Sequence, residues 1–254
     1  MTHIVLPHAK YGRSGADKLR SLSRVNIRLA PQLANTMLNG RRSEHAAESF
    51  NAFVERTGYQ FTSDSVSNNI PFIAPLLTEF GMRRGVAPIR YLEIGAYEGR
   101  NLAFMSWLLP DRLEVTVIDP WFNEDFNPDQ EYVGIEARYH ANMELARFRS
   151  LKTLRSTSEV ELPKMLAAKN HFDIIYVDGS HAALAVMSDM CFAASLLEVG
   201  GIMVLDDYWH DVSEITGPGV KQAVDQFLTI FGDYFRVDAV YRQVVVTKTA
   251  PIPR

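Results

Sequence analysis

Residues 90–109 constrain the fold more than any other part of this 254-residue chain. Residues 91–94 predict a short buried strand, Gly95 and Gly99 predict a turn, and the apolar stretch that follows predicts a helix. A strand that turns through glycine into a helix presents backbone N–H groups and the positive helix end to a ligand. The spacing is Glu-x-Gly-x-x-x-Gly, which differs from the Gly-x-Gly-x-x-Gly of dinucleotide-binding folds. We expect a nucleotide-like ligand at this turn, and we expect a side chain in place of glycine to block its approach.

Apolar runs and helical patterns alternate along the chain from residue 89 onward. The last two strands, Tyr234–Val240 and Gln243–Thr247, are joined by a turn too short for a crossover helix, so they must be antiparallel. This order predicts an α/β fold with a doubly wound, mostly parallel, seven-stranded sheet that ends in an antiparallel hairpin. The other predicted strands are residues 89–94, 114–118, 151–154, 172–177 and 202–205, and the predicted helices include 100–109, 159–168, 182–197 and 220–231.

The chain divides into an N-terminal extension, residues 1–60, and one domain, residues 61–254. The extension predicts a few short helices, and a further helix should follow Asn69 as its N-cap and end near Gly81. Basic side chains dominate residues 1–42. We expect this segment to be an arm, a lid or an oligomer contact, although a transit peptide or a contact with an anionic partner has a similar composition.

Composition excludes several classes of protein. The net charge of −4, from 26 basic and 30 acidic side chains, creates no general attraction for nucleic acid. The single cysteine, Cys191, excludes an intramolecular disulfide framework and predicts a reducing compartment, which favours the cytoplasm. No apolar run approaches the roughly 20 residues of a membrane span, and no secretory signal is evident.

Polar and acidic residues follow the ends of the predicted strands, where open parallel sheets bind their ligands. Asp119 can accept hydrogen bonds from both hydroxyls of a ribose, and Trp121 can stack on an adenine. Each of these residues also has an ordinary structural role open to it: a turn acid for Asp119, a buried aromatic residue for Trp121, and a helix N-cap for Ser158. The strand-end residues are Glu93, Gly95, Asp119, Thr157, Ser158, Asp178, Asp206 and Asp207.

Asp178, Asp206 and Asp207 should meet at the ends of two neighbouring strands. Three carboxylates so close would repel one another unless a cation lay between them. Oxygen ligands favour Mg²⁺, with Mn²⁺ or Ca²⁺ also open, and the absence of a Cys/His ligand spacing disfavours zinc. The alternative is that one aspartate caps a helix and another pairs with an arginine.

His181, three residues after Asp178, is the candidate general base. A neutral imidazole can take a proton from a hydroxyl whose acidity a bound cation has raised. His210 is the rival base or a substrate contact, and His171 is expected at the surface.

Four motifs in this order resemble the class I S-adenosylmethionine-dependent methyltransferases. More closely, the chain is similar to a bacterial group that resembles the metal-dependent macrolide sugar O-methyltransferases and, more distantly, the catechol O-methyltransferases. The motifs are YLEIGxxEGR at Tyr91–Arg100, IDPW at Ile118–Trp121, YVDGSH at Tyr176–His181 and GGIMxxDDY at Gly200–Tyr208. The likeness covers about residues 61–248.

The resemblance implies S-adenosylmethionine as cofactor, a small-molecule hydroxyl as acceptor, Asp119 on the ribose and Ser158 near the adenine. It also implies Mg²⁺ held by Asp178, Asp206 and Asp207, and His181 as base; the catechol enzymes have Lys at the place of His181 and Asn at that of Asp207. The alternative function is a cofactor-binding protein of the same fold that carries out another reaction or none. A homo-oligomer is expected. The implied cofactor-binding residues are Glu93, Gly95, Ala96, Tyr97, Gly99, Asn101, Asp119, Trp121, Thr157, Ser158 and Asp178.

Overall fold

A computed structural model describes residues 29–39, 44–121, 134–209, 212–213 and 217–253. Its main sheet has seven strands in the order β3-β2-β1-β4-β5-β9-β8. The first five run parallel, and β9 pairs antiparallel with both β5 and β8. This confirms the predicted doubly wound sheet and its C-terminal hairpin. The strands are β1 (Ile89–Ile94), β2 (Leu113–Ile118), β3 (Ser150–Leu154), β4 (Phe172–Val177), β5 (Leu197–Leu205), β8 (Phe235–Val240) and β9 (Val244–Lys248).

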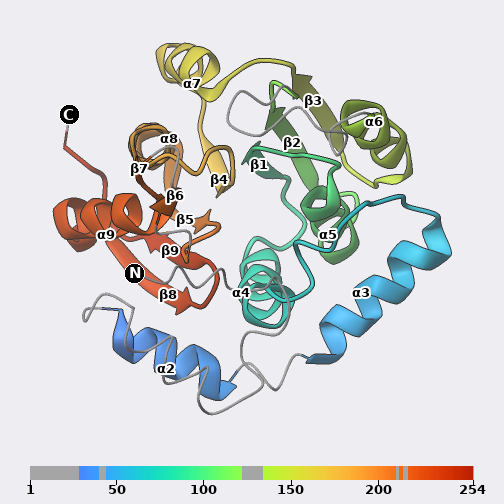
Figure 1. The fold of residues 1–254 in the computed structure, drawn as a ribbon, viewed down its shortest axis with the longest axis horizontal. Coiled ribbons are helices and arrows are strands. Elements are labelled where there is room, and N and C mark those ends of the chain that lie inside the picture. The colour runs from blue at the N-terminus through green and yellow to red at the C-terminus, as the bar shows by residue number, and fades with distance from the viewer. Residues whose placement is uncertain (1–28, 40–43, 122–133, 210–211, 214–216, 254) are drawn as a thin grey trace.

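Helices cover both faces of the sheet (Figure 1). Successive residues of a strand point to opposite faces, so Tyr91 of β1 packs in one buried cluster and Leu92 packs in the other. The cluster that contains Tyr91 includes residues of α3 (Glu44–Thr57), α4 (Ile70–Arg83), α5 (Arg100–Leu108) and α6 (Ile135–Leu145). The cluster that contains Leu92 includes residues of α7 (Ser158–Ala167), α8 (Ala183–Leu196) and α9 (Val220–Phe231).

Within the described part of residues 1–60, where the sequence predicts a few short helices, two helices precede α4. Phe50 of α3 is fully buried, and its ring lies 5.6 Å from that of Phe104 in α5, edge to face. In α2 (Ala30–Asn39), the Thr36 hydroxyl accepts a hydrogen bond of 3.2 Å from the Val240 N–H of β8. The two helices therefore lie at different places on the domain (Figure 1).

Two element boundaries differ from those predicted by more than one residue, and one hairpin was not predicted. The helix expected to end near Gly81 continues to Arg83, because Gly81 keeps helical geometry and the next glycine along the chain, Gly85, is the one with a positive φ. Strand β5 begins at Leu197 rather than Ile202, since the Gly200 turn lies within an extended segment. A short hairpin of β6 (Val212–Ser213) and β7 (Gly217–Pro218) follows β5 and was not predicted.

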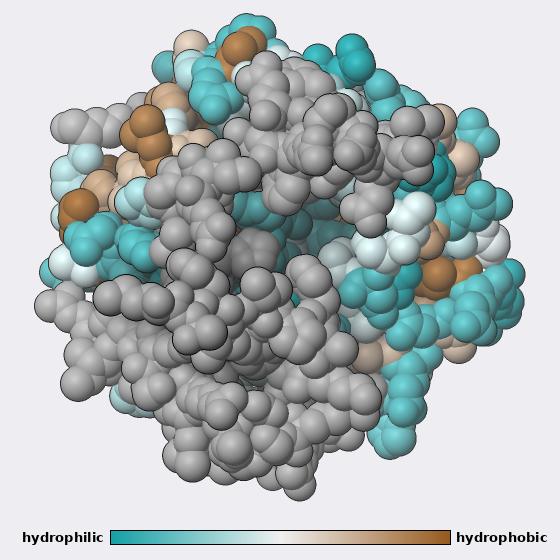
Figure 2. All heavy atoms as spheres, in the orientation of Figure 1, coloured by the Kyte–Doolittle hydropathy of each residue, from teal (hydrophilic) through white to brown (hydrophobic). Residues whose placement is uncertain are grey.

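The surface of the domain is hollowed near the middle of the same view, and hydrophilic side chains are visible in the depth of this hollow (Figure 2). Among the described residues, no helix combines the length and the apolar character needed to cross a bilayer.

Candidate active site

The turn after β1 is held against the turn after β4. Gly95 has φ +83°, and a Cβ built on it would stand 2.0 Å from the carbonyl oxygen of Asp178. The Asp178 N–H donates to the Ile94 carbonyl at 2.8 Å. Gly95 is therefore required by protein packing, because any side chain would collide with the neighbouring backbone. This is a different reason from the expected one, in which a side chain would block a ligand.

Asp119, at the end of β2, anchors the glycine turn. One carboxylate oxygen accepts hydrogen bonds from the N–H groups of Ala96 and Tyr97, at 2.7 and 2.9 Å. The other accepts from the Trp121 N–H at 2.7 Å. Burial raises the pKa of Asp119, although these three backbone donors oppose the rise. An ionised carboxylate has about four acceptor positions, so the predicted contact with ribose hydroxyls remains open to it.

Glu93 and Asn101 lie beneath the same turn, in the core. Glu93 is 1 % exposed, and it accepts hydrogen bonds from the Tyr91 hydroxyl and, at 2.8 Å, from the Asn101 amide. Burial raises the pKa of Glu93 to about 8. The sequence-based prediction made both residues cofactor contacts, and here they form a buried polar network below the loop.

Trp121, Thr157 and Ser158 lie beyond the ends of β2 and β3. The Trp121 indole N–H donates to the Tyr97 carbonyl at 3.0 Å, and its ring lies 4.7 Å from that of Tyr139 in α6. Thr157, rather than Ser158, takes the N-cap position of α7, but it makes no side-chain capping bond. The helix begins one residue earlier than predicted, so the N-cap role weighed for Ser158 does not apply.

Three of the predicted polar residues converge at the ends of β4 and β5. Asp178, His181 and Asp207 each offer one ligand atom, and these atoms all lie within 4.8 Å of one another. His181 Nε2 is 2.9 Å from Asp207 Oδ2. Asp207 has φ +53°, a left-handed conformation that costs a non-glycine residue energy and that recurs at functional sites.

Asp206 has different partners, although it was predicted as a ligand beside Asp207. One of its oxygens accepts from the Tyr176 hydroxyl and, at 2.8 Å, from the Gln243 amide. The other accepts from the Asp207 N–H at 2.7 Å. Its carboxylate is therefore fixed by β4 and by the residue that precedes β9, and it is not in the cluster of three.

The acidic residues perturb one another. Enclosure by protein atoms, and then the charges of Asp206 and Asp207, raise the pKa of Asp178 well above its ordinary value, although this side chain still reaches solvent. Burial and the charge of Asp207 raise the pKa of Asp206 to about 6. Like charges held together in this way fit a site that receives a cation. The two carboxylates of the cluster offer the oxygen ligands that Mg²⁺ and Mn²⁺ prefer.

Several residues that hold the site were missed by the sequence reasoning. Glu98 is 1 % exposed; it pairs with Arg138 of α6 and accepts from the Thr62 N–H and hydroxyl, the latter at 3.0 Å. The Asn142 amide donates to the Glu98 carbonyl at 2.9 Å. The position of Glu98 inside the glycine motif could have marked it as a residue of the site. Its partners could not be predicted, because they are distant in sequence. Gln243 gave only the weak signal of a polar residue before an apolar strand.

The two remaining histidines have different outcomes. His171 is exposed, as predicted. His210, the rival base, lies outside the described residues.

Comparison with protein families assigns the central part of the chain. Residues 92–208 match the model of a family described as a methyltransferase domain. This stretch contains the glycine turn, Asp119 and the cluster of Asp178, His181 and Asp207. The chain is thus a methyltransferase enzyme, and S-adenosylmethionine is the cofactor that this family implies. No curated protein matches the chain in sequence.

Solved structures share the fold. A candidate O-methyltransferase from Klebsiella pneumoniae superposes with a TM-score of 0.53 at 15 % identity, over 87 % of this chain and 98 % of its own. An O-methyltransferase from Bacillus cereus, in complex with SAH, gives 0.50 at 15 % identity, over 87 % and 100 %. A candidate rRNA methylase from Clostridium thermocellum gives 0.50 at 14 % identity, over 76 % and 99 %. At such identities the likeness establishes the class I methyltransferase fold alone, and it does not name an acceptor.

Proposed function

We propose that this protein is an S-adenosylmethionine-dependent O-methyltransferase that acts on a hydroxyl of a small molecule with the help of Mg²⁺. The acceptor would be a sugar, a glycosylated natural product or a diol-like metabolite. The observation that carries the proposal is the 2.9 Å contact between His181 and Asp207 beside Asp178. Asp178 and His181 follow β4, which pairs with β1, and Asp207 follows β5, which pairs with β4. The glycine turn after β1 is in backbone contact with Asp178.

His181 would act as the general base. Asp207 contacts its Nε2, so it would orient the ring and stabilise the imidazolium after the proton moves. The acceptor hydroxyl would lose its proton as it attacks the methyl group of the sulfonium. The rest of the site contributes positioning and electrostatics, which are large parts of any methyl transfer.

Asp178 and Asp207 would hold the cation, and Asp206 would complete or support this set. When bound, a divalent cation lowers the pKa of a hydroxyl that coordinates it. Tyr176 and Gln243 both donate hydrogen bonds to the Asp206 carboxylate. These bonds would hold its orientation fixed while Asp178 and Asp207 bind the cation. The raised pKa values of Asp178 and Asp206 support this proposal, because a bound cation would offset the repulsion between these carboxylates.

The cofactor would lie across the ends of β1, β2 and β3. Asp119 would accept from the ribose hydroxyls, while Ala96 and Tyr97 would form the wall that it anchors. Trp121, Thr157 and Ser158 would surround the adenine. Glu93 and Asn101 would act from beneath the turn.

The proposal is tested with methyl-labelled S-adenosylmethionine and a panel of methyl glycosides and vicinal diols, with MgCl2 or with EDTA. We expect label on an acceptor oxygen, by mass spectrometry, and a large loss of turnover in EDTA. Label on nitrogen or carbon would contradict O-methylation, and near-normal turnover in EDTA would contradict the metal. Cofactor binding without transfer to any acceptor class would favour the non-catalytic alternative.

The role of His181 is tested by His181→Ala. We expect a loss of turnover of about 10²- to 10⁴-fold, the usual range for a general base. Added imidazole should restore part of the activity if His181 is a base, while the concentration of Mg²⁺ needed for half-maximal rate stays unchanged. A large rise in the Mg²⁺ requirement without rescue by imidazole would make His181 a metal ligand instead. His171→Ala, at an exposed histidine outside the site, is the matched control.

A further inference from the structure

Two buried side-chain amides have oxygens without a hydrogen-bond partner. Asn69, which precedes α4, and Gln243, in the short link between β8 and β9, are each 3 % exposed. Neither Asn69 Oδ1 nor Gln243 Oε1 receives a hydrogen bond from the described residues. Buried polar atoms in native proteins nearly always have a partner, so two such oxygens call for donors that come from outside this part of the chain.

The local structure explains neither oxygen. Gln243 Nε2 donates to Asp206 Oδ2 at 2.8 Å, and only the nitrogen of the amide can do so, because an ionised carboxylate is solely an acceptor. The amide therefore cannot turn over to pair its oxygen. Asn69 is the N-cap of α4, where its oxygen would ordinarily accept a hydrogen bond from the helix, yet it makes no such bond.

Both amides line one narrow pocket between the start of α4 and the link between β8 and β9. The other residues that line it are Phe72, Ile73, Ala239, Tyr241 and Val245. The rings of Phe72 and Tyr241 lie 4.2 Å apart, so a ligand that enters has to move one of them. Phe72 is the partly exposed member of this pair, and such a side chain can change its rotamer at little cost.

The pocket lies at the end of the sheet where the candidate site is. Val244 of β9 pairs with Leu205 of β5, so the residues just before β9 lie where β5 stops. Gln243 is one of these residues, and its nitrogen contacts Asp206, the neighbour of Asp207 in the candidate metal cluster. Gln243 is therefore shared between the pocket and the candidate site.

The lining limits what the pocket can bind. The two unpaired amide oxygens accept hydrogen bonds, and most of the remaining lining is apolar. A carboxylate or phosphate would face these oxygens without a donor, so an anionic group is disfavoured. A neutral group with hydroxyl donors on a carbon frame fits both parts of the lining.

We propose that this pocket is a subsite for the methyl acceptor, in which Asn69 Oδ1 and Gln243 Oε1 accept hydrogen bonds from hydroxyls that are not methylated. The inference rests on the proposed function and deepens it, because it requires an acceptor with further hydroxyls beyond a simple vicinal diol. Gln243 would orient the acceptor through its oxygen and Asp206 through its nitrogen.

The test uses the methyl glycosides of the panel above and their monodeoxy analogues, each of which lacks one hydroxyl other than the methylated one. We expect the wild type to prefer a methylated glycoside over one of its analogues by about 10- to 100-fold in kcat/KM. Asn69→Leu has a similar volume and no oxygen, so this preference should fall below about 3-fold. The KM for S-adenosylmethionine should stay within about 2-fold of wild type. Asn69 gives the cleaner test, because Gln243 also contacts Asp206.

Stability provides a second measurement that needs no acceptor. Asn69→Leu removes an unpaired buried oxygen and no capping bond, so without acceptor it should resist urea at least as well as the wild type. A clear loss of stability with an unchanged preference would show that Asn69 serves the fold alone. Asn69→Ala should lose the same preference, and it replaces the leucine variant if that protein does not fold.

Asn170→Ala is the matched control, because Asn170 is an exposed asparagine just before β4, and its preference should stay within about 2-fold of wild type. A wild type without preference among the analogues, or a preference that both Asn69 variants keep, would overturn the inference. Methylation of simple vicinal diols with no glycoside accepted would also overturn it, while the proposed function would stand. Methylation of no compound in the panel would instead reject the proposed function, and this inference with it.

Discussion

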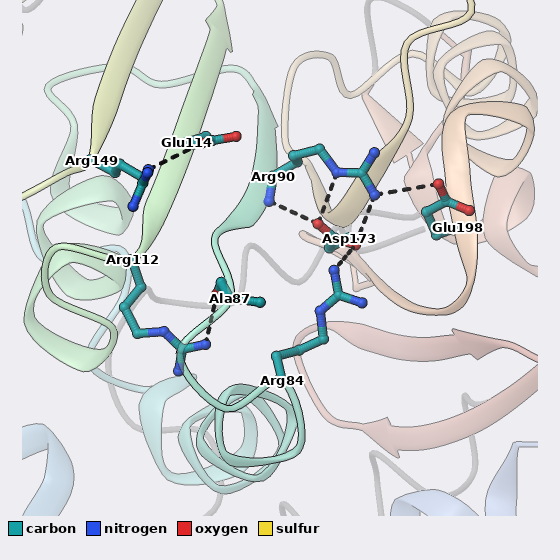
Figure 3. Close-up of polar contacts among 8 residues, drawn as sticks. All are labelled: Arg84, Ala87, Arg90, Arg112, Glu114, Arg149, Asp173 and Glu198. Carbon is teal, nitrogen blue, oxygen red and sulfur yellow. Dashed lines mark hydrogen bonds and ion pairs between the residues drawn. The ribbon is translucent and has the colours of Figure 1, made fainter.

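The two ends of the parallel strands surround their carboxylates with different partners. At the end where β4 begins, Asp173 is 1 % exposed and receives four hydrogen bonds, three from Arg90 and one from Arg84 (Figure 3). At the end where β4 and β5 stop, Asp178, Asp206 and Asp207 lie together. Asp206 accepts hydrogen bonds from the Tyr176 hydroxyl, the Gln243 amide and the Asp207 N–H, and Asp207 contacts the His181 imidazole.

The pKa shifts follow the same division. Burial alone would raise the pKa of Asp173, but the hydrogen bonds and charge of Arg90, with the charge of Arg84, hold it below its ordinary value. The pKa values of Asp178 and Asp206 are raised. Left-handed φ values occur at both ends: at Asp111 and Lys169 before β2 and β4, and at Tyr97, Trp121 and Asp207 after β1, β2 and β5. The comparison teaches that two arginines neutralise the carboxylate at one end, while at the other end the neighbouring carboxylates raise the pKa values of Asp178 and Asp206.

A large effect is expected from a substitution at the end where β4 begins, which we call the balanced end because Arg84 and Arg90 neutralise Asp173 there. Asp173→Asn removes the charge that holds two guanidinium groups, and it should lower the free energy of unfolding by about 3 kcal/mol, at the low end for a buried ion pair because both arginines are 40 % exposed. Urea unfolding at pH 7 measures the change. Glu198→Gln, which alters only an exposed partner of Arg90, should cost less than about 1 kcal/mol. Equal effects of the two variants would contradict the special position of Asp173.

The second prediction concerns pH and Glu93. Its pKa is about 8 in the folded protein and 4.5 as the ordinary value, so the folded state holds a proton that the unfolded chain releases between these values. The free energy of unfolding should therefore fall as pH rises from about 4.5 to 8, by roughly 2 to 4 kcal/mol from this group alone. Glu93→Gln cannot titrate, and its stability should exceed that of the wild type most at pH 8 and least at pH 5. A difference between the two proteins that does not vary with pH would disprove the shift.

The third prediction concerns the acidic end. With EDTA present, Asp178→Asn should unfold at a higher temperature than the wild type, because it removes repulsion worth about 1 kcal/mol. Millimolar MgCl2 should raise the midpoint of the wild type by a few degrees through preferential binding to the folded state, and it should leave Asp178→Asn unchanged. If MgCl2 shifts both proteins equally, the ion acts through general screening and not at this cluster.

The smallest effect is expected at an ion pair near the balanced end that is open to solvent. Glu114 and Arg149 lie 3.3 Å apart, with side chains 40 % and 57 % exposed (Figure 3). Glu114→Gln should change the free energy of unfolding by no more than about 0.5 kcal/mol, since side-chain ordering and screening offset most of the attraction in such pairs. A loss approaching that of Asp173→Asn would show that burial is not what separates the two.

Much of the fold was predictable because the apolar periods are strong. The bounds of β1, β4 and α9 agree with those predicted, and the short link between β8 and β9 required an antiparallel hairpin. The errors came where glycine has more than one use. Gly81 stays helical and Gly200 lies within a strand, and a single sequence does not distinguish these from turns.

The sequence indicates which residues lie near the candidate site better than it indicates how their side chains are arranged. Strand ends brought Asp178, His181 and Asp207 together as expected from the topology of parallel sheets. The separation of Asp206 from Asp207 depends on a left-handed backbone at Asp207 and on Gln243, which lies 37 residues from Asp206 along the chain. The donors that fix Glu98 and Asp119 depend on tertiary packing in the same way. Local pattern carries no information on such partners.

The backbone contact at Gly95 has a consequence for protein engineering. Because the space for a Cβ there is filled by the Asp178 carbonyl, the turns after β1 and β4 interlock as one mechanical unit. A chimaera that imports an acceptor-binding loop from a relative by exchanging only the turn after β4 would disturb the packing of that turn against the turn after β1. Residues 94–95 and 178–179 should therefore be transplanted together, as a single module, whenever the specificity of this scaffold is redesigned.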